Sequence, residues 1–154
     1  MSEMSKILDN LRRQCSRREY CTSDVLKKAE KALEGDKEKA MQVVATLVEE
    51  KFVDDLRYAS AYAREKSAIS GWGEVKIRYM LSAKGIARDV IAQALAEVDP
   101  NRADSRLIKL LENKYRTLRE DPQCKLKLLR FALGRGYSYD EVSGHIDALM
   151  KKDK

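Results

Sequence analysis

The stretch Lys84-Gly85-Ile86 ends one apolar helical pattern and begins another, and Arg135-Gly136-Tyr137 does the same 51 positions later (136 − 85). A fixed period of this size is typical of tandem helical modules, because one small unit cannot bury its apolar stripe alone and stacks on a copy. Four pairs of apolar residues share the offset: Ile77 with Leu128, Met80 with Phe131, Ile91 with Val142, and Leu95 with Ile146.

Apolar residues recur every three or four positions along most of the chain, and the 154 residues include only 7 glycines and 2 prolines. This spacing indicates helices, and no segment alternates in the manner of a strand. The sequence predicts an all-α protein of three tandem three-helix repeats, stacked into an elongated, curved array that is right-handed or crescent-like. We expect repeats at residues 1–53, 54–98 and 99–150 and a basic tail at 151–154, with the first repeat the least faithful copy.

Polar residues and glycines mark the predicted helix boundaries. Thr22 or Ser23 is a candidate N-cap for the second helix. Asp99-Pro100 and Asp121-Pro122 start two later helices, since proline fits the first helical position. Ser138 and Glu141 have the spacing of a capping box. Glycine followed by an apolar residue predicts a Schellman-type stop.

The net charge of +6 is unevenly distributed, with an excess of +1 in residues 1–53, 0 in 54–100 and +5 in 101–154. The last third is therefore where we expect contact with a polyanion or an acidic protein face. Three cysteines with no CxxC pair favour reduced thiols in a cytoplasmic protein. No apolar run is long enough to span a bilayer. No long heptad seam is present, so we expect a monomer.

No catalytic arrangement is evident in the sequence. The only histidine, His145, lies on a short predicted helix without a partner serine or cysteine. The Gly71-Trp72-Gly73 turn lacks the spacing of a phosphate-binding loop. Asp54 and Asp55 are adjacent and point about 100° apart on a helix, which favours capping over acid–base or metal chemistry. We expect no enzyme activity, no cofactor and no metal site.

Binding features are more numerous than catalytic ones. Six basic residues lie within one stretch of twenty positions in the last repeat. Either they contact phosphates or an acidic groove, or they form an ordinary solvent-exposed helix face. Trp72 is either a plug between modules or an exposed stacking platform, of which the plug is more common. We expect the tyrosines of the middle repeat to be core or inter-repeat residues. The six basic residues are Arg116, Arg119, Lys125, Lys127, Arg130 and Arg135, and the tyrosines are Tyr58, Tyr62 and Tyr79.

The middle repeat resembles the RecX family, regulatory proteins of the bacterial RecA recombinase. The similarity rests on residues 51–59 (KFVDDLRYA), the Gly71-Trp72-Gly73 turn and Lys84-Gly85-Ile86, and extends to Arg135-Gly136-Tyr137. Lys51 occupies a position where the family usually has glycine, so the turn there must accommodate a lysine. Val25 replaces the acidic residue expected three positions after Thr22, which predicts loss of a capping box.

The resemblance implies three-helix repeats that lodge in the groove of the RecA–DNA filament and inhibit recombinase, ATPase and coprotease activities. The partners it implies are RecA and DNA, with DNA bound weakly in the absence of RecA. The alternatives are a stand-alone basic nucleic-acid-binding protein and a passive helical scaffold. Expected partner-binding residues are Arg57, Tyr58, Tyr62, Lys66, Trp72, Lys76, Arg78, Lys84, Lys125, Lys127, Arg130 and Arg135. Expected structural residues are Asp54, Asp55, Gly71, Gly73, Gly85, Ile86 and Gly136.

Overall fold

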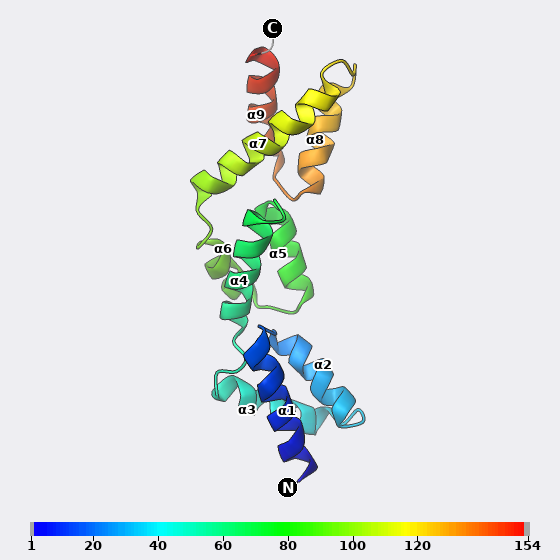
Figure 1. The fold of residues 1–154 in the computed structure, drawn as a ribbon, viewed down its shortest axis with the longest axis vertical. Coiled ribbons are helices and arrows are strands. Elements are labelled where there is room, and N and C mark those ends of the chain that lie inside the picture. Colours follow the sequence, from blue (N-terminus) through cyan, green and yellow to red (C-terminus); the bar gives the residue numbers. More distant parts are fainter. Residues whose placement is uncertain (1, 153–154) are drawn as a thin grey trace. The chain divides into compact units, whose positions relative to one another are not determined.

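The computed structural model describes residues 2–152, and within that range the chain forms nine α-helices and no strand (Figure 1). The prediction of an all-α chain is confirmed. The helices are α1 (Glu3–Arg17), α2 (Thr22–Ala32), α3 (Lys37–Glu49), α4 (Asp55–Ala68), α5 (Glu74–Ala83), α6 (Arg88–Leu95), α7 (Pro100–Leu118), α8 (Cys124–Gly134) and α9 (Tyr139–Lys152).

The 51-residue period extends to the first repeat, where the sequence alone did not reveal it. The second helix of each repeat ends at a left-handed residue: Glu34 (φ 54°), Gly85 (φ 76°) and Gly136 (φ 96°). These residues are 51 positions apart (85 − 34 and 136 − 85). Each stop is closed by the hydrogen bond typical of a Schellman motif, for example from the Ile86 N–H to the Leu81 carbonyl (3.4 Å).

Most of the apolar pairs at this offset are buried, but Met80 and Phe131 are not. Met80 is 37% exposed, Tyr79 beside it is 72% exposed, and Phe131 is only half-buried. The buried stripe of α5 passes through Ile77 and Leu81, four residues apart, so Met80 and Tyr79 lie off the stripe. The prediction of a core or inter-repeat Tyr79 was therefore wrong, and Met80 lies outside the buried stripe although it shares the 51-residue offset.

Packing divides the chain into two compact units. The first, unit 1, consists of the residues up to Ala61 together with Leu81–Ala94, and the second, unit 2, consists of Tyr62–Met80 together with the residues from Leu95 onward. Each unit therefore contains one complete set of three helices and part of the middle set.

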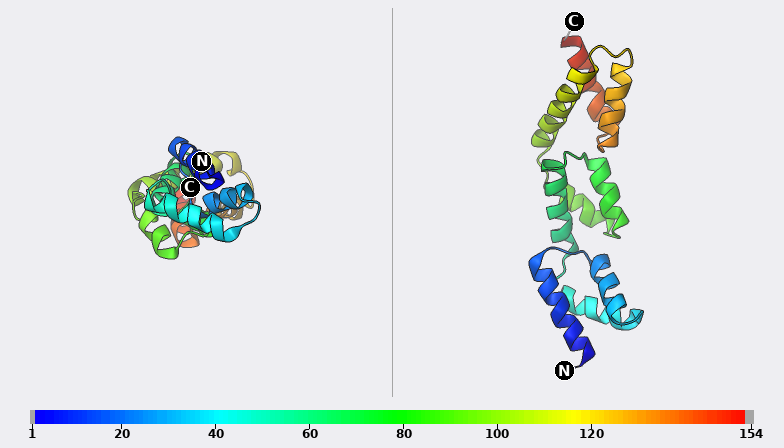
Figure 2. Two further views of the ribbon diagram at one scale, coloured as in Figure 1. Left: turned by 90° about the horizontal axis from the view of Figure 1, so that it is seen from below. Right: turned by 45° about the vertical axis from the view of Figure 1, so that its right-hand side comes forward.

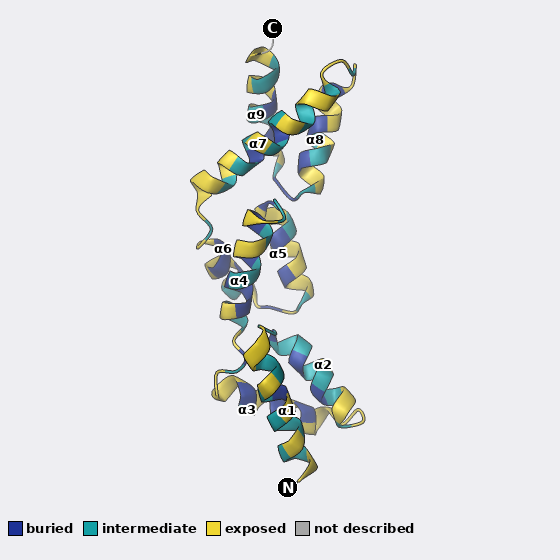
Figure 3. Cartoon of the chain, in the orientation of Figure 1, coloured by how far each residue is buried: buried dark blue, intermediate teal, exposed yellow. Residues whose placement is uncertain are grey.

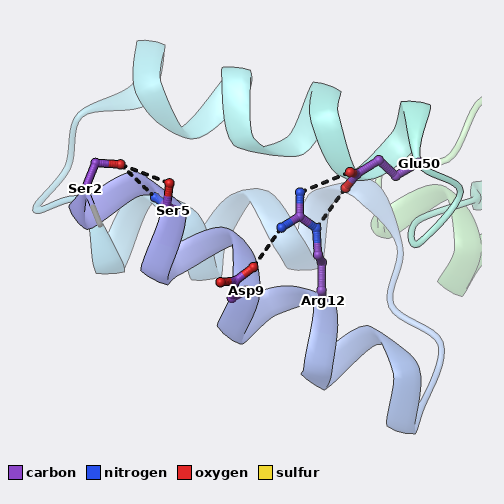
Figure 4. A network of polar contacts seen from close by, with 5 residues as sticks. All are labelled: Ser2, Ser5, Asp9, Arg12 and Glu50. Carbon is purple, nitrogen blue, oxygen red and sulfur yellow. Dashed lines mark hydrogen bonds and ion pairs between the residues drawn. The ribbon is translucent and has the colours of Figure 1, made fainter.

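The core of unit 1 lies among α1, α2 and α3, which are side by side in Figures 1 and 2. Arg12 of α1 spans polar groups at the edge of this core (Figure 4). Its guanidinium donates to both carboxylate oxygens of Glu50, at 2.9 and 3.0 Å, and to Asp9 at 2.8 Å. The buried side chains are Leu11, Val25, Ala29, Ala40, Val43, Val44, Leu47 and Val53.

The start of α2 differs from the sequence prediction. Its N-cap is Cys21 rather than Thr22 or Ser23, and the carboxylate of Asp24, three positions later, accepts a hydrogen bond from the Cys21 N–H at 3.4 Å. The expected loss of a capping box was wrong, because the register of the cap is one residue earlier than predicted from Thr22.

The turn after α3 accommodates Lys51 in the left-handed conformation, with φ of 65°. The Phe52 N–H donates to the Leu47 carbonyl at 2.9 Å, which closes the turn in the same way as the glycine stops. A non-glycine residue is strained in this conformation because its Cβ crowds the backbone.

The core of unit 2 lies among α7, α8 and α9, whose inward faces are the dark blue segments in Figure 3. Asp99 caps α7 with Pro100 in its first turn, and Ser138 and Glu141 form the expected capping box of α9. The start of α8 was predicted too early. Its N-cap is Gln123, because Asp121 accepts from the Gln123 N–H at 2.8 Å and forms a turn before the helix.

The end of the chain lies partly outside the described residues. The helix α9 continues through Lys152, so the first two lysines of the predicted basic tail are helical. Asp153 and Lys154 lie outside the residues that the structure describes. Over the described range, no helix has both the length and the apolar character needed to cross a membrane.

Candidate partner-binding surface

Trp72 anchors a cluster of aromatic and basic side chains in unit 2. It follows Gly71, which has a φ of 69° and lies three residues after the end of α4, and the backbone N–H of Trp72 donates to the Lys66 carbonyl at 2.9 Å. The ammonium groups of Lys66 and Lys76 lie 4.9 and 4.3 Å from the centroid of the indole, and Tyr62 meets it edge-on at 6.3 Å. Such contacts each contribute about 0.5–1 kcal/mol when exposed.

This arrangement gives Trp72 a role between the two predicted ones. The side chain is half-buried and lines a cavity of about 70 Å³ with Ile77 and Tyr137. A cavity of this size is far below the roughly 300 Å³ of a small-molecule site. The cluster can therefore present positive charge beside an aromatic face, but it does not enclose a ligand.

The backbone of Gly73 is in direct contact with the backbone of the residues that follow α8. Its N–H donates to the Arg135 carbonyl at 2.8 Å, and the Val75 N–H donates to the Gly136 carbonyl at 2.9 Å. A Cβ added at Gly73 would lie 2.5 Å from the Gly136 carbonyl oxygen, and a Cβ added at Gly136 would overlap Lys76. Both glycines are required here because the two backbones approach too closely for side chains.

Arg135 was expected on the binding surface but is used within unit 2. Its guanidinium donates to the Ser70 carbonyl at 3.0 Å and lies 5.2 Å from the centroid of the Phe131 ring. Nearby, Arg106 donates to the buried hydroxyl of Ser67 at 2.8 Å. The Arg106–Ser67 link was not found by sequence reasoning, because the two residues are 39 positions apart and neither belongs to a motif.

The basic face of α8 is partly neutralised by neighbouring carboxylates. Lys125 pairs with Asp147 at 3.0 Å, and Lys127 pairs with Asp121 at 2.5 Å. The hydrogen bond from Lys127 lowers the pKa of Asp121. Arg130 is exposed and has no ion pair among residues 2–152. Of these three cations, Arg130 is the most available to an external partner.

Three expected binding residues in unit 1 have internal partners. Arg57 bonds to Glu19 at 2.5 Å and to the carbonyls of Lys51 and Phe52 at 3.1 and 3.2 Å, which ties it to the turn after α3. Tyr58 is buried, and Lys84 is paired as described below. In unit 2, Arg78 forms an exposed pair with Glu74 one helical turn away.

Lys84 connects the end of α5 to the start of α2. Its ammonium donates to Asp24 at 2.8 Å, and its carbonyl accepts from the Ser23 hydroxyl at 2.6 Å. Burial raises the pKa of Asp24, but hydrogen bonds from Lys84 and Cys21 outweigh it and lower that pKa overall. The spacing of Asp24 after Cys21 could have revealed the cap, but nothing in the sequence links Asp24 to Lys84.

The acidic pair at the start of α4 has two separate structural roles. Asp54 accepts from the Arg57 N–H at 3.0 Å and caps the helix, whereas Asp55 accepts from the Thr22 N–H at 2.7 Å. Ile86, directly after Gly85, is buried. Residues 2–152 contain no group of three or more His, Cys, Asp or Glu side chains that could hold a metal ion.

Comparison with known proteins identifies the repeats. Residues 54–95 match the model of the second three-helix domain of RecX, and residues 103–144 match that of the third. The chain is 31% identical over 116 residues to the regulatory protein RecX of Clostridium tetani, which covers 73% of this chain and 53% of that protein. It is 38% identical over 98 residues to that of Vibrio parahaemolyticus, which covers 62% of this chain and 61% of that protein.

A solved structure has the same fold. The crystal structure of RecX from Lactobacillus salivarius matches with a TM-score of 0.82 at 22% identity, over 96% of both chains. The matched region spans about half the length of the Clostridium relative. The domain models and the named relatives lead to one conclusion: this chain is a member of the RecX family of regulatory proteins.

Proposed function

We propose that this chain is a non-catalytic regulator that binds the groove of the RecA–DNA filament in the cytoplasm and inhibits recombinase, ATPase and coprotease activities. It would thereby regulate DNA repair and the SOS response. The observation that carries the proposal is the match of residues 54–95 and 103–144 to two RecX domains. RecA is the partner we propose, and the similarity of the chain to regulatory proteins of the RecX family supports this choice.

The charge distribution and the repeat architecture support this function. The excess of +5 in residues 101–154 suits a filament that carries DNA phosphates and acidic protein surface. A chain of repeats offers several separate surfaces and can contact more than one protomer of a polymer. The exposed Arg130 and the Trp72 cluster (Tyr62, Lys66, Trp72 and Lys76) are the groups we propose for contact, with the wider set of expected residues around them.

The test is inhibition of the DNA-dependent ATPase of RecA. The wild-type chain should inhibit at near-stoichiometric or lower amounts. Replacing Lys125, Lys127 and Arg130 together with glutamate should raise the concentration needed for half inhibition. The matched control replaces Lys27, Lys31 and Lys37 with glutamate. These three lysines are exposed in unit 1, and the change in net charge is the same. No inhibition by the wild-type chain at large excess would remove the proposal.

A stand-alone nucleic-acid-binding protein is the second candidate, favoured by the same charge excess in residues 101–154. Measuring DNA affinity at several salt concentrations without RecA separates the two. A filament regulator should bind naked DNA weakly, whereas tight binding with a steep salt dependence supports the stand-alone function. We propose that the chain acts as a monomer, which sedimentation equilibrium can test.

A further inference from the structure

A groove of about 500 Å³ lies between α7 and α9 in unit 2. The two helices cross one another in both Figure 1 and the right-hand view of Figure 2. The floor of the groove is apolar and includes Ile108, Leu111 and Leu149. At one side His145 is fixed by Asp104, with 2.7 Å between Nε2 and Oδ1. A groove of this volume can take one or two bulky side chains or a small molecule, but not a protein domain.

The rim of the groove is predominantly positive. Among residues 2–152, Arg116, Arg119 and Lys152 line it, and Glu112 is the one lining carboxylate. Arg116 and Lys152 are exposed, and within the described part of the chain neither forms an ion pair. Both lie near the C-terminal ends of their helices, where positive charge is favourable. The helix dipoles account for the charge but not for the apolar hollow beneath it.

We propose that this groove binds an acidic peptide segment of a partner protein, with one or two bulky apolar side chains inserted between α7 and α9. The apolar floor would cover the inserted side chains, and Arg116 and Lys152 would meet flanking carboxylates. This inference does not depend on the proposed function, because it specifies a ligand chemistry and not RecA.

The charge argues against the other occupants. A second copy docked symmetrically would bring the same cations of the rim against themselves, since a two-fold interface pairs each surface with itself. A nucleic-acid strand would satisfy Arg116 and Lys152 through its phosphates, but its flat bases with polar edges would fill the aliphatic hollow beside Leu149 less well than bulky apolar side chains do. An acidic, apolar peptide satisfies both parts of the groove.

The test uses fluorescence anisotropy with the full chain and a short labelled helical peptide. The probe is rich in glutamate and carries leucines four residues apart, so that they lie on one face. Two further peptides replace the leucines with serine or the glutamates with lysine. The acidic, leucine-bearing peptide should bind saturably and more weakly as salt rises, and both others should bind at least about tenfold more weakly, a difference of about 1.4 kcal/mol.

Three variants locate the binding. Ala148, an exposed residue that lines the groove, is replaced by tryptophan to fill it, which should abolish binding. Arg116→Glu should weaken binding about fivefold or more, an effect of about 1 kcal/mol for one charge contact. Lys109→Glu makes the same charge change on the exposed face of α7, outside the groove, and should have little effect.

The possible results separate the alternatives. Binding that Ala148→Trp does not affect would overturn the proposal, as would equal binding of the lysine peptide. Concentration-dependent dimerisation that Ala148→Trp abolishes would assign the groove to a second copy and would also overturn it. Because the assay contains no RecA or DNA, its failure leaves the ATPase result of the proposed function unaffected, and the reverse also holds.

Discussion

Unit 1 and unit 2 join equivalent parts of the repeat in different ways. In unit 1 the Lys84 carbonyl accepts from the side chain of Ser23, and the Lys84 ammonium pairs with Asp24. In unit 2 the carbonyl of Arg135, 51 positions later, accepts directly from the backbone of Gly73. The acceptor is the same element of the repeat in both units, but the donor is a side chain in one and backbone in the other.

The difference follows from the residues beside the left-handed stop. Gly136 has Lys76 in immediate contact with the place where a Cβ would be, whereas nothing lies within 4 Å of that place at Gly85. A close backbone contact depends on the absence of side chains, while a side-chain contact depends on charge and pH. The unit 2 junction should therefore be sensitive to added volume and the unit 1 junction to removed charge.

The largest expected effect is that of alanine at Gly136. Gly136→Ala combines the strain of a positive φ with overlap on Lys76 and should lower the free energy of unfolding by about 3 kcal/mol. Gly85→Ala, the matched change in unit 1, carries only the strain and should cost about 1 kcal/mol. Urea unfolding followed by circular dichroism measures both, and equal losses would refute the distinction between the junctions.

A smaller effect is expected when the charge of Asp24 is removed. Asp24→Asn keeps the shape but weakens the bond with Lys84 and the cap on Cys21, and should cost about 1 kcal/mol. Glu74→Gln, which breaks the exposed pair with Arg78 on α5, should cost only about 0.3 kcal/mol. If the two substitutions had the same effect on urea unfolding, the unit 1 junction would not depend on this charge.

The pH dependence of unfolding tests the same contact. The pKa of Asp24 is lowered below its ordinary value of 3.8, so its contribution is complete above that pH and is lost as the pH falls through the lowered value. The hydrogen bond to Asp24 raises the pKa of Lys84 above 10.5, so Lys84 stays charged at neutral pH. The stability difference between wild type and Asp24→Asn should be constant from about pH 5 to 7 and shrink below about pH 4. A difference that does not change with pH would contradict this assignment.

A smaller change than that at Asp24 is expected in unit 1, and it is a gain in stability. Lys51→Gly removes the strain of a lysine at φ 65° but adds the flexibility of glycine to the unfolded chain, for a net gain of about 0.5 kcal/mol. Gly134→Ala removes a glycine from α8 instead of adding one. The new Cβ meets nothing within 4 Å, and alanine favours the helix more than glycine does, so this change should also stabilise slightly. Loss of stability in Lys51→Gly would mean that the lysine side chain stabilises the turn.

Most of the fold could be predicted from local signals. The glycine stops at Gly85 and Gly136 follow apolar helical patterns, so the repeat was visible in the second and third copies. The first copy has Glu34 at the same left-handed position and Cys21 as the cap, neither of which is a residue that usually marks those sites. Its period became visible only in the backbone conformation.

The candidate site was less predictable, because its availability depends on partners distant in the sequence. Lys125 and Lys127 form a basic pair in the sequence, but Asp147 and Asp121 neutralise them in the fold. Arg57 has the charge of a binding residue but is bonded to Glu19, 38 positions away. Local spacing identifies charged residues, and only the tertiary structure shows which of them remain available.

The most direct test of the proposed regulator is an electron cryomicroscopy reconstruction of RecA filaments on single-stranded DNA with this chain at saturating concentration. We expect additional density for three-helix repeats along the filament groove, with the Trp72 cluster and the exposed Arg130 facing RecA or DNA. Filaments without added density, under conditions where the chain remains folded, would contradict it.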